Sequence, residues 1–338
     1  MPGPIHGIKV LELAQIMAGP SCGLLLADLG ADVVKVEKIP DGDDTRRFTP
    51  PDVNGEAAAF MTMNRNKKGF ALDLKSNEGK EVFKKMVKKA DVIVENFRKG
   101  TLEKLGIGYE ELKKINPKII LCEISGYGRT GPYADKGGFD LVAQGMSGLM
   151  SITGESSDKP PMKVGAPITD ITAGILGATG VLAALIHRDK TGEGQRVDTS
   201  LYEAGIIHTY WQSAITSATG KSPGPLGSAH PLTAPYQAFK TKDKWITVGA
   251  SNQNNWIHLL EALYYSNDLN KVCVDAKGKK YYTYDGIEHD LKPVDEVDES
   301  YLKDPLIDIE KLVNSELFNK LSKVDGNEMG VNYVKSAL

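Results

Sequence analysis

Asp170 is the residue whose position in this sequence best suits chemistry. It stands between a loop that contains Pro167 and a long apolar run, within the stretch KVGAPITDITAGILGATGVLAALIHR at residues 163–188. An Asp just before an apolar, helix-periodic run is most often an N-cap, whose carboxylate accepts hydrogen bonds from free backbone N–H groups. The local sequence therefore favours a capping role, and the rest of the chain must decide whether Asp170 also takes part in a reaction.

Basic residues near the ends of the predicted strands form a second group that could bind a ligand. They are Lys38, Arg46, Arg47, Lys67, Lys68, Lys75, Arg98, Lys99 and Lys104. Cations gathered at strand ends suit a phosphorylated ligand, although solvated surface charges explain the pattern about equally well. Asn96 and Phe97 add a paired donor and acceptor and a flat ring, which would suit a purine. No G-x-G-x-x-G follows the first strand and no G-x-x-x-x-G-K-[ST] occurs, which disfavours the usual dinucleotide and P-loop sites.

Two alternating periodicities in the first 125 residues predict the elements that would position these side chains. Helical patterns occur at 21–30, after Ser76 and at 101–114. Apolar runs typical of strands lie at 8–13, 32–37, 70–74, 91–95 and 119–124, with one more at 195–201. Strands separated by helices imply right-handed crossovers and a mostly parallel sheet. We therefore predict an α/β fold with a mostly parallel, Rossmann-like sheet and flanking helices. In such folds, ligands bind outside the C-terminal ends of the strands.

The strand predicted at 32–37 alternates valines with charged residues, so Lys35 and Glu37 are expected to point outward. After the strand region, the apolar helix that begins near Asp170 ends in basic residues followed by Gly192, which is a typical helix C-terminus. Residues 202–217 also have a helical pattern.

A Gly-, Pro- and Ser-rich segment at 219–228 predicts a domain boundary. We divide the chain into a large α/β domain at 1–200, a linker helix at 201–225 and a smaller α/β domain at 226–338. The smaller domain should open with a hairpin at 236–240 and 245–249 and a short helix at 255–263. Beyond that helix, a strong period returns only at 307–321.

The composition is that of an ordinary globular protein. The chain has 338 residues, of which 41% are hydrophobic and 25% charged, and its net charge of -3 gives no reason to expect nucleic-acid or anionic-membrane binding. Cys22, Cys122 and Cys273 are widely spaced, which favours buried free thiols in a reducing cytoplasm and no cysteine metal site. The N-terminus lacks the pattern of a secretory signal. The apolar run at 171–186 is better explained as a buried helix than as a membrane span.

The ordered motifs of the chain resemble those of the class III coenzyme A transferases, a family that includes formyl-CoA and carnitinyl-CoA transferases and the related α-methylacyl-CoA racemases. The resemblance runs from about residue 7 to 263. Its motifs are LELAQIMAGP at 11–20, LGADVVKVE at 29–37, DDTR at 43–46, NRNKK at 64–68, VENFR at 94–98, SGYG at 125–128, GP at 131–132 and KTGEGQ at 190–195. Two further segments, GSAHP at 227–231 and PYQAFKTKD at 235–243, look most like the succinyl-CoA-dependent dicarboxylate branch.

The resemblance implies that Asp170 is the catalytic nucleophile of a CoA transfer. The carboxylate would attack a donor thioester to give a mixed anhydride, and then carry CoA as an aspartyl thioester until the acceptor acid takes it. Backbone N–H groups of the helix that follows would steady the developing negative charge. No cofactor is implied beyond coenzyme A, which is a substrate.

The family's CoA-binding positions carry over to the strand ends and to one later stretch. They are Gln15, Ile16, Ala18, Lys38, Leu72, Lys75, Asn96, Phe97, Arg98, Lys104, Lys136, Gly137, Gly138, Phe139 and Asp140. Residues 136–140 would lie along the pantetheine. Lys38 and Lys104 stand where the family often has Arg, and Lys lacks the bidentate fork of a guanidinium, so looser phosphate contacts are expected.

Two departures from the family pattern narrow the predicted activity. The racemase branch needs a general base where this chain has Phe139, which disfavours racemisation. The resemblance implies an interlocked homodimer, but the chain departs from the pattern after Leu263 and stops early, so a shortened second domain is expected. That departure leaves open a CoA-binding protein that does not turn over. His230, in a Gly/Ser/Pro loop, is a candidate contact for the acceptor acid.

Overall fold

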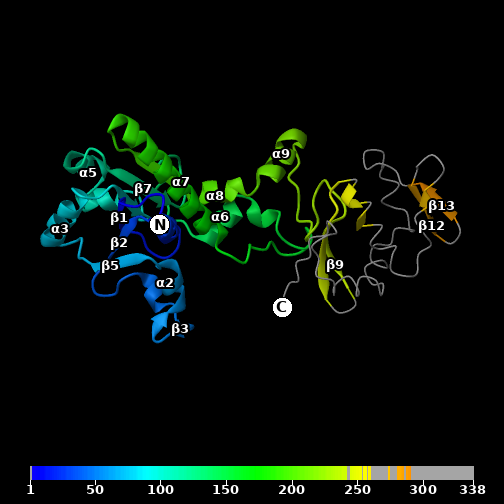
Figure 1. Cartoon of the computed structure of the whole chain (residues 1–338), viewed down its shortest axis with the longest axis horizontal. Helices are drawn as coiled ribbons and strands as arrows, with labels where there is room; N and C mark the ends of the chain where they lie inside the picture. Colours follow the sequence, from blue (N-terminus) through cyan, green and yellow to red (C-terminus); the bar gives the residue numbers. More distant parts are fainter. Residues whose placement is uncertain are drawn as a thin grey trace. The chain divides into compact units, whose positions relative to one another are not determined.

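The computed structural model describes residues 2–241, 244–252, 254–256 and 258–259, and the backbone of three further strands between 273 and 290. The chain divides into two compact units, Met1–Pro225 and Leu226–Leu338 (Figure 1).

The first unit is built on a six-stranded parallel sheet with the order β5-β2-β1-β6-β7-β8. Its strands are β1 (Lys9–Glu12), β2 (Asp32–Glu37), β5 (Lys67–Ala71), β6 (Val92–Glu95), β7 (Ile120–Ser125) and β8 (Arg196–Ser200). This confirms the predicted α/β fold class. The chain winds outward from β1 to one edge, then returns and continues on the other side of β1 with β6. The order therefore reverses between β1 and β6, the place where doubly wound sheets bind ligands.

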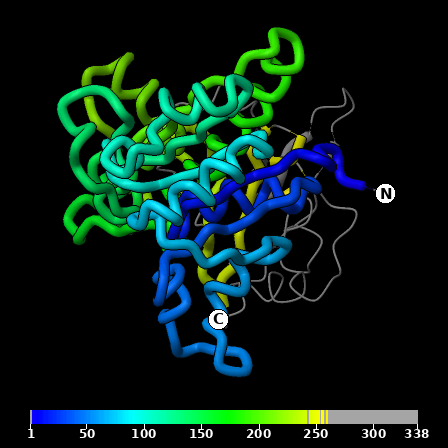
Figure 2. The backbone as a smooth tube through the Cα atoms, turned by 90° about the vertical axis from the view of Figure 1, so that its left-hand side faces the viewer, coloured from blue at the N-terminus to red at the C-terminus, as the bar shows by residue number. Residues whose placement is uncertain are grey.

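Helices cover both faces of the sheet. Phe83 and Val87 of α3 (Asn77–Val87) and Leu112 of α5 (Tyr109–Ile115) pack with strand residues such as Ile93 and Leu121. Figure 2 shows these helical segments in front of the strands of the first unit. The opposite face packs against α1 (Ala18–Asp28) and α7 (Ile168–Thr191). The remaining elements of the first unit are short: η1 (Asp44–Arg47), β3 (Asp52–Val53), β4 (Glu56–Ala57), α2 (Ala58–Met63), α4 (Thr101–Lys104), α6 (Asp140–Met146), η2 (Leu149–Ser151), α8 (Leu201–Ile207) and α9 (Tyr210–Thr219).

Most predicted elements are confirmed, with small shifts at their ends. The third strand begins at Lys67 rather than at 70, because its ladder with β2 starts at the pair Lys67 and Val33. The helix predicted at 101–114 is two helices, because Gly106 adopts a φ of 73° and ends α4. The helix predicted at 202–217 is likewise divided into α8 and α9. The helix predicted after Ser76 is α3, and Ser76 caps it, since its hydroxyl accepts from the N–H of Gly79 at 3.0 Å.

The expectation that Lys35 and Glu37 point outward from β2 is wrong. Their exposed fractions are 2% and 8%. A parallel strand inside the sheet has helices or loops on both faces, so alternation cannot leave one set of its side chains in solvent. Both residues are instead held in ion pairs, Lys35 with Glu12 and Asp43, and Glu37 with Arg46.

The long helix α7 is the element that carries Asp170. Among the described residues it is the one helix long and apolar enough to cross a membrane. Its small residues instead permit close packing inside the unit: a Cβ added to Gly174 would lie 2.7 Å from the carbonyl oxygen of Ala18 and 2.5 Å from Cβ of Ser21. The helix ends at Gly192, with a φ of 79°, and has Arg188 and Lys190 in its last turn, as predicted. It therefore fits the predicted role of a core helix.

The second unit contains the predicted hairpin, in which β9 (Tyr236–Lys240) and β10 (Trp245–Gly249) pair antiparallel with Trp245 opposite Lys240. Three more antiparallel strands follow, β11 (Cys273–Val274), β12 (Lys280–Tyr284) and β13 (Ile287–Asp290). The predicted helix at 255–263 is only partly described, and the periodic segment at 307–321 lies outside the described residues.

Candidate active site

The reversal point of the sheet joins two of the predicted binding segments. The backbone N–H of Gln15, after β1, donates to Oδ1 of Asn96, after β6, at 2.9 Å. Nδ2 of Asn96 donates to the carbonyl oxygen of Gln15 at 2.8 Å. Both polar ends of the Asn96 amide are therefore used to hold the turn after β1. The suggested contact of this amide with a purine stays a prediction, and the ring of Phe97 lies half-buried next to it.

The stretch 136–139 lies across the same edge of the sheet. A Cβ added to Gly138 would come within 2.3 Å of Cα of Gly126, the residue that follows β7, so the two backbones cross at a distance that only glycines allow. A Cβ on Gly137 would lie 3.5 Å from the guanidinium nitrogens of Arg98, beyond the end of β6. The structure thus brings Gly137 next to Arg98 and Gly138 next to Gly126, although these residues are distant in sequence or lie in different segments.

Asp170 is not the N-cap of its helix. The cap position of α7 belongs to Pro167, and Asp170 lies in the first turn without a capping hydrogen bond. The free N–H group at this helix end is instead bound by Asp140, the first residue of α6. Oδ1 of Asp140 accepts from the backbone N–H of Thr169 at 3.0 Å and from its hydroxyl at 2.8 Å. A capping carboxylate from a residue 29 positions before Thr169 could not be found from the local sequence.

Asp140 therefore holds the N-terminus of α7 in place. Its second oxygen, Oδ2, accepts from Nε2 of Gln144 at 2.8 Å, and Oε1 of Gln144 accepts from the N–H of Val164 at 2.9 Å. These contacts join α6 to the loop before α7 and fix the start of the Asp170 helix. The contact of Asp140 with CoA stays a prediction.

The surroundings of Asp170 disfavour its charged form. Gly174, one turn further along α7, packs against the start of α1, so Asp170 lies near the turn that precedes α1. Burial, and secondarily the negative charge of Asp140, raise the pKa of Asp170 to about 7. Near neutral pH such a carboxylate is ionised in a substantial fraction of molecules but is poorly solvated, which suits a nucleophile.

We expect Asp140→Asn to shift the pH dependence of any reaction that uses the Asp170 carboxylate. Below its pKa of about 7, Asp170 is protonated and cannot attack, so the rate should rise with pH and level off above that value. Asn keeps an oxygen that can accept from Thr169 but removes the charge. The midpoint of the pH profile should therefore move to lower pH. The movement should be less than half of the rise in the pKa of Asp170 above its ordinary value, because burial is the larger cause of that rise.

The measurement for Asp140→Asn is the pH profile of hydroxylamine-trapped Asp170 after incubation with an acyl-CoA. Asp135→Asn is a suitable control, because Asp135 is an exposed carboxylate of the same segment that faces Lys99. A midpoint that stays at wild-type pH in Asp140→Asn, or that moves equally in the control, would contradict the assigned electrostatic role.

The basic residues predicted near the strand ends are of two kinds, those with an acidic partner in the part of the chain that the structure describes and those without one. Most of them have acidic partners within the unit: Lys38 and Arg47 with Asp44, Arg46 with Glu37, Lys67 with Glu12, Lys68 with Asp32, and Lys99 with Asp135. Among the described residues, Lys75, Arg98 and Lys104 have no acidic partner, and all of them are exposed. An unpaired, solvent-facing cation next to a strand end is available for a phosphate group.

Two of the basic residues were wrongly placed at the rim where the strands end. Lys67 and Lys68 begin β5, and the Lys67 side chain is buried, with 1% exposed, against Glu12 and the carbonyl oxygen of Pro20. The pattern alone could not show this, because a lysine that a buried carboxylate neutralises has the same sequence appearance as a surface lysine.

A buried cluster beneath the turn after β1 was missed by sequence reasoning. It contains Glu12, Lys35, Asp43 and Lys67, which we call the buried ion cluster. The available signal was the set of charged residues inside the motifs at 11–20, 29–37, 43–46 and 64–68, whose spacing does not show that they meet. The cluster touches Ile16, whose φ of 69° is rare for a β-branched residue and costs about 1–3 kcal/mol.

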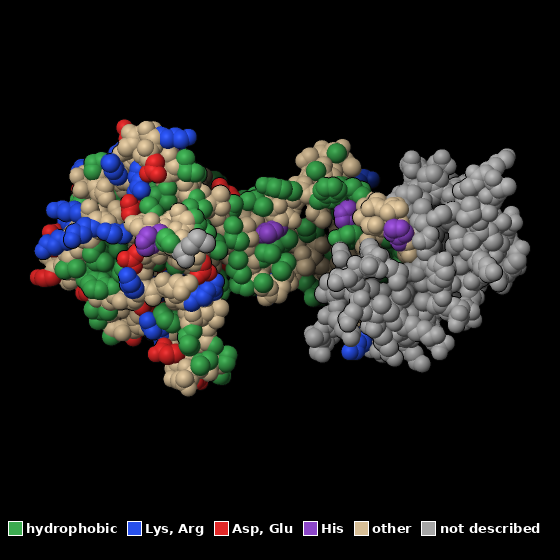
Figure 3. All heavy atoms as spheres, in the orientation of Figure 1, with side chains coloured by type: hydrophobic (Ala, Val, Ile, Leu, Met, Phe, Trp, Pro, Cys, Tyr) green, Lys and Arg blue, Asp and Glu red, His purple; other side chains and the backbone are tan. Residues whose placement is uncertain are grey.

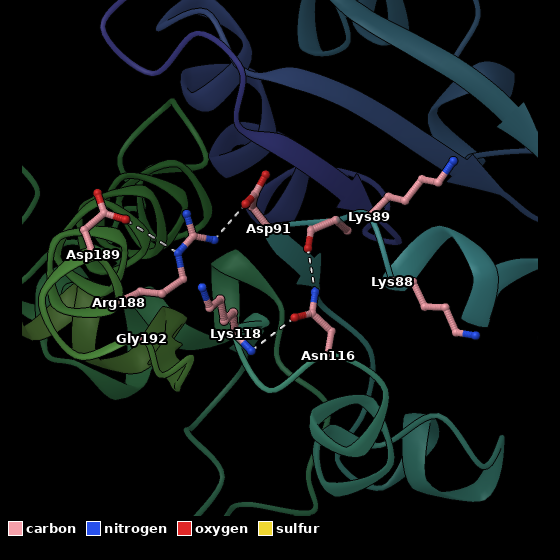
Figure 4. Close-up of a pocket in the computed structure, with 9 residues that line it drawn as sticks. Lys88, Lys89, Asp91, Asn116, Lys118, Arg188, Asp189 and Gly192 are labelled. Atoms are coloured by element: carbon pink, nitrogen blue, oxygen red, sulfur yellow. Dashed lines mark hydrogen bonds and ion pairs between the residues drawn. The ribbon is translucent and has the colours of Figure 1, made fainter.

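A cavity of about 510 Å³ lies at the opposite edge of the sheet, where β6 and β7 begin (Figure 4). Arg188 there bonds to Asp91 at 2.8 Å and lies 3.8 Å from Asp189, while Lys88 and Lys89 point away from them. These lysines follow the C-terminus of α3, where cations commonly offset the helix dipole. Since this cavity lies at the N-terminal ends of the strands, it is not the candidate active site.

Among the described residues, no cluster of His, Cys, Asp or Glu could hold a metal ion.

The chain is similar in sequence to known proteins over most of its length. Residues 5–273 match CoA-transferase family III. Succinate–glutarate CoA-transferase of Agrobacterium fabrum is 43% identical over 266 residues, which cover 77% of this chain and 66% of that protein. Succinyl-CoA:mesaconate CoA-transferase of Haloarcula hispanica is 43% identical over 273 residues, covering 77% and 67%. Human succinyl-CoA:glutarate CoA-transferase is 40% identical over 277 residues, covering 82% and 62%.

A CAIB/BAIF family protein from Brucella suis has a similar solved structure, with a TM-score of 0.72 and 41% identity over 82% of this chain and 73% of that one. The chain thus spans between 62% and 67% of the length of the curated relatives named above.

Proposed function

This chain belongs to CoA-transferase family III, and on that premise we propose that it moves coenzyme A from an acyl-CoA donor to a carboxylic acid by way of Asp170. The observation that carries the proposal is the Asp170 carboxylate itself. It is poorly solvated, has a pKa raised by burial to about 7, and stands at the start of α7 near the reversal point of the sheet. The names of the similar proteins support succinyl-CoA as donor and a dicarboxylate as acceptor.

The proposed reaction consists of acyl exchanges that consume no proton overall. An Oδ of Asp170 attacks the thioester carbonyl, the C–S bond breaks, and an aspartyl–acyl anhydride and CoA thiolate result. The thiolate attacks Cγ of Asp170, which releases the donor acid and leaves an aspartyl–CoA thioester. The acceptor carboxylate attacks this thioester to form a second anhydride, and the thiolate then takes the new acyl group and restores Asp170.

The residues around Asp170 support each requirement of this reaction. A carboxylate with few solvent contacts loses little hydration when it attacks. The cap that Asp140 provides fixes the helix start, so Asp170 keeps one orientation through successive attacks. Phe139, with 72% of its side chain exposed, has no group that moves a proton, which disfavours the racemase alternative.

We propose that the CoA diphosphate and ribose phosphate are bound by the unpaired cations Lys75, Arg98 and Lys104. The ring of Phe97 would lie against the adenine, and residues 136–138, which cross the strand ends, would line the pantetheine. Lys38 is less available than the resemblance implies, since it bonds to Asp44 at 2.8 Å. His230 belongs to the second unit and contacts the Tyr236 ring, so its contact with the acceptor is also a proposal.

A homodimer in the cytoplasm completes the proposal. Figure 3 shows hydrophobic atoms over the part of the first unit that carries α6 and α8. The exposed apolar side chains of this region are Phe139, Leu141, Val142, Met146, Ile175, Ile206 and Tyr210. An apolar surface of this kind supports contact with another copy of the chain.

Cys22 and Cys122 are free and buried, which supports a reducing compartment such as the cytoplasm.

The decisive experiment is isotope exchange between succinyl-CoA and a panel of labelled acids. We expect label from [¹⁴C]succinate to enter succinyl-CoA, and CoA to reach at least one other dicarboxylate, such as glutarate. Addition of hydroxylamine during turnover should convert Asp170 to a hydroxamate, detectable in its tryptic peptide. Exchange with monocarboxylates only would refute the dicarboxylate assignment. Binding of CoA without exchange or hydroxamate would refute the transferase and leave a CoA-binding protein.

A further inference from the structure

Side chains from distant segments bind five backbone polar groups of the turn after β1 and of the start of α1. Asn96 holds both the N–H and the carbonyl oxygen of Gln15. The N–H of Ile16 donates to both carboxylate oxygens of Asp43, at 3.2 and 3.3 Å. Nζ of Lys35 donates to the carbonyl oxygen of Ala14 at 2.8 Å, and Nζ of Lys67 donates to that of Pro20 at 2.8 Å. The turn and the start of α1 therefore depend on side chains from β2 and β5, from Asp43 before η1 and from Asn96 after β6.

Asp43 is itself held in place from two sides. Its Oδ1 accepts from the N–H and hydroxyl of Thr45, at 2.9 and 2.8 Å. Its Oδ2 lies 2.8 Å from Nζ of Lys35. Lys35 in turn lies 2.9 Å from Glu12, whose other oxygen is 2.8 Å from Nζ of Lys67. The buried ion cluster is thus a chain of alternating charges that ends on the backbone of the turn.

The cluster does more than join neighbouring strands. Side-chain exposure is 2% for Lys35 and 0% for both Glu12 and Asp43, so their charges have lost nearly all hydration. Buried ion pairs are poor sources of net stability, but they hold a geometry firmly because any departure leaves a charge unpaired. Here the geometry that they hold is the left-handed conformation of Ile16, which an Ile adopts only when its surroundings impose it.

We propose that Lys35 and Asp43 are positioning residues for coenzyme A. They impose the left-handed conformation on Ile16 and thereby set the turn at 15–17 that receives the CoA donor beside Asp170. This inference rests on the proposed function, because the turn matters to the reaction only if CoA binds there. Neither residue is expected to touch the reacting atoms.

The test is a double-mutant cycle between the cluster and the strained residue. Lys35→Met combined with Asp43→Ala removes one charge of each sign and leaves the Glu12–Lys67 pair intact, which favours folding. Ile16→Gly removes the steric penalty of a positive φ, because glycine adopts that conformation readily. We expect the cluster variant to bind CoA about tenfold more weakly in the Ile16 background and less than about threefold more weakly in the Ile16→Gly background. A purely structural role would weaken binding equally in both.

Calorimetric titration with CoA, at a temperature where circular dichroism shows every variant folded, gives these affinities. Amide hydrogen exchange over residues 13–24 should rise in the cluster variant, since the Ile16 N–H loses its acceptor. Asp43→Asn, which keeps an oxygen near Ile16, should retain most of the affinity. Arg188→Met combined with Asp91→Asn removes a matched ion pair at the opposite edge of the sheet and should leave CoA affinity unchanged.

The outcomes separate this inference from the proposed function. Wild-type binding of CoA, together with an unchanged affinity in the cluster variant, would overturn the positioning role alone. A loss of affinity that is the same with Ile16 and with Gly at that position would also overturn it. A wild-type chain that binds no CoA and forms no Asp170 hydroxamate would instead refute the proposed function, and the positioning role with it.

Discussion

Asp170→Asn should abolish CoA transfer, with a fall in rate of about 10⁴-fold or more, while the protein stays folded. An amide can form neither an acyl anhydride nor a CoA thioester, so no alternative route through this residue exists. The helix start should survive the change, because its capping bond comes from Asp140 and not from Asp170. Exchange of labelled succinate with succinyl-CoA measures the loss, and the hydroxamate-bearing peptide should disappear at the same time.

The same variant should be more stable than the wild type at neutral and higher pH. In the folded wild type the pKa of Asp170 is raised to about 7, whereas in the unfolded chain it is near the ordinary value of about 4. The folded state therefore binds the proton more tightly, and wild-type stability falls as pH rises from about 4 to about 7. Asn has no such titration. The melting temperatures of the two proteins should agree near pH 4 and diverge in favour of Asp170→Asn up to pH 7.

A large drop in stability at all pH values would mean that the lost activity reflects unfolding rather than chemistry. Retention of exchange above about 1% of the wild-type rate would rule out Asp170 as the obligatory carrier of CoA. Thr169, the neighbouring residue that Asp140 binds, offers a check on the cap. Thr169→Val should reduce stability without removing the hydroxamate, because it removes a hydroxyl bond but leaves the nucleophile in place.

The second large effect is expected at Arg98. Arg98→Ala should weaken CoA binding by about 10- to 100-fold, since a charge-assisted and potentially bidentate contact to a phosphate is lost. Among the described residues Arg98 has no carboxylate partner, and it lies against Gly137 of the stretch that crosses the strand ends. Titration of the folded variant with CoA gives the affinity directly. Arg98→Lys should restore only part of it, because Lys lacks the planar fork.

Lys68→Ala is the matched control for Arg98→Ala. Lys68 is also exposed and basic, but it bonds to Asp32 at 2.6 Å and belongs to the beginning of β5. We expect its removal to change CoA affinity by less than about twofold. The difference between the two variants should shrink at high salt, where phosphate contacts are screened. If Arg98→Ala and the wild type bind CoA with equal affinity, the CoA phosphates do not bind at the end of β6.

The sequence alone was sufficient for the fold class and for the family. Parallel strands and their covering helices leave a repeated alternation of short apolar runs and amphipathic stretches, and this signal is local. It placed β1, β2, β6, β7 and β8 within a few residues of their observed bounds. The motifs that carry the family resemblance are likewise contiguous in sequence. Asp170 could be predicted as the nucleophile for that reason alone, without any knowledge of its surroundings.

Tertiary structure decided which charged groups are available and what each one does. Lys67 and Arg98 have the same appearance in sequence, yet one is buried against Glu12 and the other is exposed without an acidic partner. The helix cap comes from Asp140 rather than Asp170, and Lys35 lies inside rather than outside. Hydration and Coulomb energies depend on distances in space, and the partners here are tens of residues apart. The pattern along the chain therefore predicts which carboxylate reacts, while only the folded chain determines the pKa and orientation of that carboxylate.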